Sequence, residues 1–239
     1  MEFTYKAYEG LVNLIRDEGY DFKGYHDFDE KPCVIMRHDI DLDVKKAYEL
    51  SLFEDKLGLK STYFALLNTD FYNLASNTCK DLLKDMIARG HEVGLHFDEA
   101  RYAGLDSYEA IVEREAGVLS EILETPVKAV SMHRPSEKAL TGDWKFEGIV
   151  NSYSSLFFKE FKYLSDSRMN WRENPENAIK SGEFKHIQIV THPFWYGESQ
   201  GEFKNLLLRF AKAAGAERYD ALCDNIKDFE TVIKKEEIC

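Results

Sequence analysis

Apolar residues recur with two different spacings along the chain, and these spacings predict alternating helices and strands. Residues 4–18 carry apolar side chains three and four positions apart, the period of an amphipathic helix, and Gly19 ends it. Short apolar runs between such segments predict strands. Further helices are expected at residues 43–57, 77–89, 106 or 107 to 123, 175–180 and 200–214. Strands are expected at residues 33–41, 61–67, 91–96, 127–132, 146–153, 161–164 and 186–190.

This alternation of strands and helices predicts parallel β-α-β units and therefore an α/β fold. No repeat, low-complexity tract or linker marks a domain boundary, so we expect a single domain over residues 1–239. Residues 20–31 are polar and aromatic and are expected to form a loop. The charged tail from Glu217 is expected to be a helix packed on the outside.

The charge balance argues against nucleic acid as a partner. The chain has 31 Lys and Arg against 43 Asp and Glu, a formal net charge of −12, whereas binding to a phosphate backbone needs a basic face. The first residues lack the segments of a signal peptide, and no run approaches the roughly 18–20 apolar residues of a membrane span. Cysteines without C-x-x-C spacing favour a reducing compartment, so we expect a cytoplasmic protein. They are Cys33, Cys79, Cys223 and Cys239.

Two carboxylates end the first predicted strand, and their spacing marks them as a candidate site. If the strand extends to Asp41, alternation puts Asp39 and Asp41 on one face, roughly 7 Å apart, with His38 facing the other way. Two carboxylates this close repel each other unless a metal ion or a shared proton resolves the conflict. Asp43 is expected to cap the following helix.

Other polar side chains also come directly after predicted strands. In a parallel β/α barrel the carboxyl ends of the strands lie at one face, where the loops build the active site. The sequence therefore predicts a site at that face, assembled from Asp39, Asp41, His96, His133, Arg134, Asp166 and His192.

Five segments in order resemble the motifs of the polysaccharide deacetylase family, the NodB-homology domain of carbohydrate esterase family four. The resemblance spans about residues 32–215 and implies a distorted barrel of about seven parallel strands. It also implies metal-dependent removal of an acetyl group from an amino sugar. The segments are Arg37 to Asp41, Gly90 to His96, His133 to Pro135, Asp166 to Trp171 and Ile189 to Pro193.

The first motif of the family has adjacent carboxylates, one the catalytic base and one a metal ligand. Here a residue separates them, and the resemblance assigns Asp39 as the base and Asp41 as the metal ligand, although the two could be exchanged. His96 matches the first of two metal-binding histidines, but Ala100 stands at the position of the second.

The missing ligand has three candidates, because zinc accepts nitrogen and oxygen donors and a catalytic site needs three protein ligands. Asp98 and Glu99 come two and three residues after His96, and His133 ends the next predicted strand at the same face of the barrel. We prefer His133 and expect a divalent metal, zinc above others. A site without metal is the alternative.

Arg134 matches the arginine that orients the base in the family. The fourth motif supplies an Asp that holds the arginine and a Trp that lines the pocket. Asp166 with Trp171 fits better than Asp143 with Trp144, because Asp166 follows a strand-like run whereas Asp143 is expected to begin a helix.

His192 matches the histidine of the fifth motif, the general acid. A histidine with a pKa near about 6.5 is suited to protonating a leaving amine. The aromatic residues after it are expected to stack on sugar faces, although they could form a lid or an oligomer contact: Phe194, Trp195 and Tyr196.

The resemblance thus implies a carbohydrate N-deacetylase, and the lack of a secretion signal favours an amino-sugar intermediate of surface-polysaccharide synthesis as its substrate. The rearranged metal motif leaves two other hypotheses. One is a hydrolase of another amide, such as a cyclic imide or a formyl group. The other is a non-catalytic glycan-binding relative.

Overall fold

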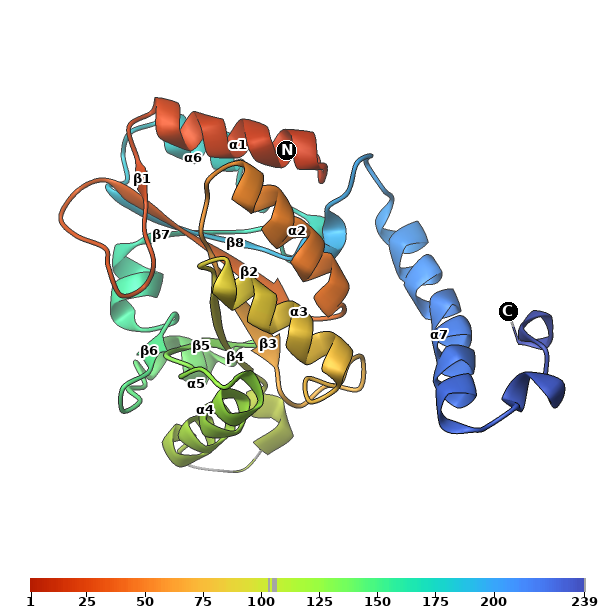
Figure 1. Ribbon diagram of the computed structural model, residues 1–239. Helices are drawn as coiled ribbons and strands as arrows, with labels where there is room; N and C mark the ends of the chain where they lie inside the picture. Colours follow the sequence, from red (N-terminus) through yellow and green to blue (C-terminus); the bar gives the residue numbers. More distant parts are fainter. Residues whose placement is uncertain (103, 105–106, 239) are drawn as a thin grey trace.

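Parallel strands form one curled sheet at the centre of the molecule (Figure 1). The computed structural model describes residues 1–102, 104 and 107–238. In this part of the chain the strand order is β6-β5-β4-β3-β2-β8-β7, and β1 pairs with the start of β2. The predicted α/β fold and distorted barrel are confirmed as a half-barrel of seven parallel strands plus the short β1. The strands are β1 (Asp21–Phe22), β2 (Cys33–Ile40), β3 (Thr62–Leu66), β4 (Glu92–Phe97), β5 (Ala129–Met132), β6 (Val150–Asn151), β7 (Lys162–Ser165) and β8 (His186–Thr191).

Helices cover the outer face of the sheet, with α1 beside α6 and α2 beside α3. Asp43 caps α2 as predicted, since its side chain accepts the Lys45 N–H at 2.8 Å. The helices are α1 (Tyr5–Asp17), α2 (Val44–Lys56), α3 (Asn77–Ala88), α4 (Glu109–Leu123), α5 (Glu137–Thr141), α6 (Pro175–Lys180) and α7 (Phe203–Asn225). Short 3-10 helices lie at Glu99–Tyr102, Ser167–Met169, Pro193–Trp195, Phe229–Thr231 and Lys235–Glu237, and a π-helical turn at Leu156–Glu160.

Several boundaries differ from the sequence prediction. The expected loop at 20–31 contains β1, and the expected strand at 146–153 shrinks to β6. Asp106, one predicted start of α4, and Cys239 lie outside the described residues. Among the residues described, no helix is long and apolar enough to cross a membrane.

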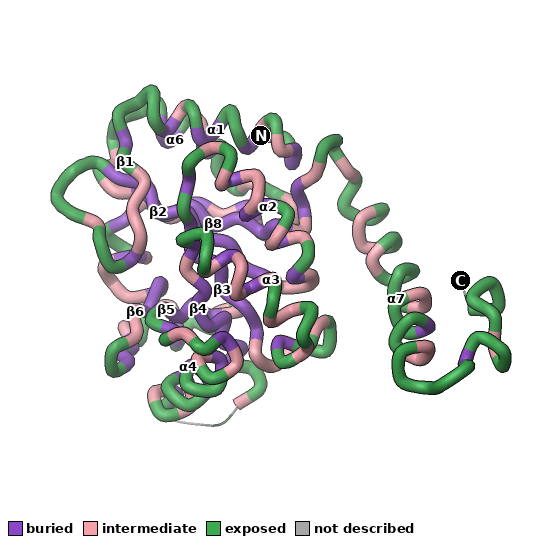
Figure 2. The backbone as a smooth tube through the Cα atoms, viewed as in Figure 1, coloured by how far each residue is buried: buried purple, intermediate pink, exposed green. Residues whose placement is uncertain are grey.

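The final helix departs most from its prediction. It was expected to end at residue 214, but α7 continues through Gly215 to Asn225, because a single glycine among helix-forming residues weakens a helix without ending it. The tail was expected to pack on the outside, and α7 does contact the outside of the body: the Phe210 ring packs on Phe71 and Phe194, and Lys45 Nζ lies 3.9 Å from Glu217 Oε1. Most of α7 is exposed or intermediate (Figure 2), and Tyr219 is its buried residue.

The interior of the half-barrel is close-packed where the site is built. Every residue of β2 is buried, and its alternate side chains point to the interior or to the helices. At Gly94 of β4 a Cβ atom would lie 2.5 Å from the Phe64 ring and 2.8 Å from the Ala129 carbonyl oxygen. Only glycine fits between β3 and β5 there, and His96 follows it on the same face of β4.

Candidate active site

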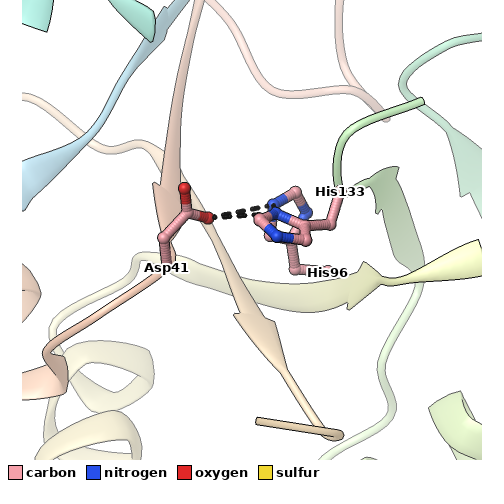
Figure 3. Close-up of side chains that lie close together, drawn as sticks. All are labelled: Asp41, His96 and His133. Carbon is pink, nitrogen blue, oxygen red and sulfur yellow. Dashed lines mark hydrogen bonds and ion pairs between the residues drawn. The ribbon is translucent and has the colours of Figure 1, made fainter. Parts of the chain in front are cut away.

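Three side chains from three strand ends point toward one another at the mouth of the half-barrel (Figure 3). Asp41 follows β2, His96 lies near the end of β4 and His133 follows β5. His96 Nε2 lies 3.3 Å from Asp41 Oδ1, His133 Nδ1 lies 3.4 Å from the same oxygen, and the two nitrogens are 3.2 Å apart. The structure thus brings together the two predicted ligands and the preferred third one.

These donor atoms fit a divalent metal ion. Asp41 Oδ1 is buried and accepts no hydrogen bond within the described residues, although both imidazole nitrogens lie within ion-pair distance of it. Zinc binds such ligands at about 2.0–2.1 Å in a tetrahedron, which places neighbouring ligand atoms about 3.3 Å apart. The observed separations have this size, and the set leaves a fourth position open. Burial alone would raise the pKa of Asp41, but the imidazoles of His133 and His96 hold it well below its usual value, so the ligand is a carboxylate.

Asp39 is held by Arg37, a residue of the first motif to which the sequence prediction assigned no role. Arg37 Nε and Nη2 donate to the two oxygens of Asp39, each at 2.8 Å. Both side chains are buried and share the interior face of β2. Burial alone would raise the pKa of Asp39, but the Arg37 guanidinium lowers it below its usual value. Alternation along a strand could have revealed this pair, since the residues are two positions apart.

His192 is oriented by a buried carboxylate. Asp166 Oδ1 lies 2.6 Å from His192 Nδ1, and Asp166 Oδ2 accepts the His192 backbone N–H at 3.2 Å and the Tyr196 hydroxyl at 3.0 Å. Burial alone would lower the pKa of His192, but the Asp166 carboxylate raises it to about 9. Its Nε2 lies 3.7 Å from Asp41 Oδ2, whereas the imidazoles of His96 and His133 lie beside Asp41 Oδ1. His192 is therefore a cation at neutral pH that borders the cluster of Asp41, His96 and His133.

The three aromatic residues after His192 do not all lie where a substrate could contact them. Phe194 and Trp195 line a small pocket together with Asp39 and Asp41, and their contact with a sugar stays a prediction. Tyr196 is 2% exposed and holds Asp166 instead, so its predicted stacking on a sugar is wrong.

Trp171 is half-buried and packs outside this pocket, against an apolar cluster whose members include Met36 of β2 and Ile189 of β8. The pocket lining does not include it, so the predicted role of Trp171 as a pocket wall has no support in the structure.

Arg134 does not hold Asp39. Its side chain is 68% exposed, and Nη2 donates to Asp98 Oδ2 at 3.0 Å. Asp98 is engaged there, and Glu99 accepts the Ser136 hydroxyl at 2.8 Å. These two candidate ligands therefore bind other partners, and Arg37 occupies the place predicted for Arg134 because it shares a strand face with Asp39.

The alternative fourth motif lies away from the cluster. Asp143 was expected to begin a helix, but α5 ends before it, and its carboxylate accepts the Ser155 N–H at 2.6 Å. Trp144 packs on Tyr108. Asp166 is thus the carboxylate that reaches the site, although its partner is His192 rather than an arginine.

No protein-family model and no curated protein matches the sequence. The fold is similar to the deacetylase PplD of Streptococcus pyogenes, with 12% identity over 78% of this chain and 80% of that one and a TM-score of 0.45. It is also similar to the peptidoglycan N-acetylglucosamine deacetylase catalytic domain of Eubacterium rectale, with 13% identity over 80% and 87% and a TM-score of 0.46. A family 4 acetyl xylan esterase of Clostridium thermocellum in complex with cobalt gives 14% over 76% and 84% and a TM-score of 0.40. These likenesses are distant, and what the site does is inferred below from this chain's own side chains.

Proposed function

We propose that the protein is a divalent-metal-dependent hydrolase that removes the N-acetyl group of an amino sugar. The observation that supports this most is the triangle of Asp41, His96 and His133 donor atoms, bordered by a buried carboxylate on one side and an imidazolium on the other. The sugar class rests on the motif resemblance. As the substrate we further propose a cytoplasmic intermediate of surface-polysaccharide synthesis.

Each side chain has a separate task in this reaction. A bound divalent ion supplies Lewis-acid chemistry, which lowers the pKa of water and polarises the acetyl carbonyl. Asp39 accepts the proton of the attacking water, and Arg37 keeps that carboxylate ionised between turnovers. His192 donates its proton to the nitrogen as the C–N bond breaks, and Asp166 stabilises the imidazolium beforehand. Water is consumed, and acetate and a free amine are released.

The non-catalytic hypothesis rested on Ala100 standing where the family has a histidine. Ala100 offers no donor atom, but His133 Nδ1 completes the set of three, so that reason no longer favours a protein without activity. Hydrolysis of a cyclic imide or a formyl group uses the same acid and base, and the choice among amides is left to a substrate panel.

Removal of metal should abolish activity, and zinc should restore it. The protein is stripped with a chelator and assayed with and without added Zn²⁺. Acetate release is followed with N-acetylated sugar nucleotides, formate release with N-formyl sugars, and ring opening with cyclic imides. We expect zinc-dependent turnover of an N-acetyl sugar. Turnover confined to an imide or formyl substrate would overturn the substrate class, and full activity of the metal-free protein would overturn the mechanism.

Replacing Asp166 with Asn should shift the alkaline limb of the pH–rate profile to lower pH. In the wild type His192 stays protonated up to about pH 9. Without the carboxylate its pKa falls toward the ordinary value of about 6.5, so the acid loses its proton at lower pH and kcat declines earlier. Tyr196→Phe removes one hydrogen bond to Asp166 but keeps its charge, and it serves as the control. An unchanged alkaline limb in Asp166→Asn would argue against His192 as the acid.

A further inference from the structure

Ser131 lies between the metal-binding cluster and the arginine that holds the base. It is on β5, directly opposite His96 of β4 in the sheet register, and its side chain is fully buried. Ser131 Oγ is 3.0 Å from His96 Nδ1 and also accepts a hydrogen bond from Arg37 Nη2. One hydroxyl therefore touches both halves of the site.

We infer that Ser131 is a positioning residue that sets His96 for metal binding and ties it to the Arg37–Asp39 pair. Arginine has donors only, so Ser131 Oγ uses one lone pair to accept from Arg37. When His96 Nε2 binds a cation, its ring proton is on Nδ1 and is donated to the second lone pair of Ser131 Oγ. Ring orientation and tautomer are thereby fixed toward Asp41.

A second serine provides a matched control. Ser152, just after β6, is also fully buried and accepts from Arg37 Nη1 at 3.2 Å. Its hydroxyl contacts the same guanidinium, and among the described residues the hydroxyl that bonds His96 is that of Ser131. Loss of either serine removes one hydroxyl from Arg37, but only loss of Ser131 removes the partner of the ligand.

The test is metal affinity, measured on metal-free protein by competition with a zinc-binding dye. Loss of a hydrogen-bond partner of a ligating histidine typically weakens metal binding about 10–100-fold, so we expect a loss of this size in Ser131→Ala and almost none in Ser152→Ala. Ser131→Thr keeps the hydroxyl and should bind like the wild type. Urea unfolding of each variant in the presence of chelator separates a change in affinity from a change in fold.

The inference rests on the proposed metal-dependent function, and the outcomes separate the two. If the wild type binds zinc and Ser131→Ala binds it as tightly, the positioning role is overturned while the proposed function stands. Equal losses in Ser131→Ala and Ser152→Ala would also overturn it, because the effect would then pass through Arg37 alone. A wild type that binds no zinc would overturn the proposed function and this role together.

Discussion

Asp39→Asn should lower the rate of acetate release by about 10²–10⁴-fold, the usual contribution of a general base. The amide keeps the size of the side chain but cannot take a proton from water. Asp39 makes its hydrogen bonds to Arg37, whereas the two histidines converge on Asp41 Oδ1. We therefore expect Asp39→Asn to retain its metal, which distinguishes a base from a ligand.

Two other variants carry the same chemical change. Asp41→Asn should lose metal as well as activity, because it weakens one of three ligands. Asp81→Asn, at an exposed position on α3, should change neither. The reverse result, with metal lost from Asp39→Asn and kept in Asp41→Asn, would exchange the two roles. Acetate release and zinc content per chain are measured on all three.

Arg37→Met should destabilise the protein by about 3–5 kcal/mol, because it leaves a buried carboxylate without its partner. The guanidinium is completely buried, bonds both oxygens of Asp39, and also packs over the Tyr153 ring with 4.8 Å between the guanidinium carbon and the ring centroid. Methionine fills much of the volume, so the loss reports chiefly the charge. Urea unfolding of metal-free protein measures it. Arg89→Met, which removes two ion pairs on the surface, should shift the midpoint little.

The pH dependence of the stability lost in Arg37→Met shows whether an unpaired charge causes that loss. In the wild type the lowered pKa of Asp39 stabilises the fold above its unfolded value of about 4, and this contribution disappears as the pH falls through the lower folded value. In Arg37→Met burial raises the pKa of Asp39 instead, so the deficit is largest at neutral pH and shrinks toward about pH 4. A deficit independent of pH would point to lost packing rather than to an unpaired charge. The combination Arg37→Met with Asp39→Leu, which buries no charge, should recover much of the lost stability.

The sequence was sufficient for the periodic parts of the fold and for the location of the site. Apolar periodicity marked β2 and α1, and parallel strands bring their carboxyl ends to one face whatever the detailed packing. That rule alone placed Asp41, His96 and His133 together, although no spacing along the chain links them.

The sequence alone could not predict contacts between segments that lie far apart along the chain. Tyr196 follows His192 in an aromatic run, but it is buried because Tyr8 of α1 packs against it with ring centroids 5.5 Å apart. Arg134 matched a motif, yet its side chain donates a hydrogen bond to the buried carboxylate of Asp98 instead. The contact between Arg37 and Asp39 could have been predicted, since strand alternation puts the two side chains on one face. The motif comparison instead assigned the role of holding Asp39 to Arg134.

The three donor atoms come from three separate strand ends rather than from one loop. A single ion held there would cross-link β2, β4 and β5 across the mouth of the half-barrel. Unfolding separates these strand ends and would therefore have to break bonds to the ion. A bound ion would thus stabilise the folded state as well as supply chemistry.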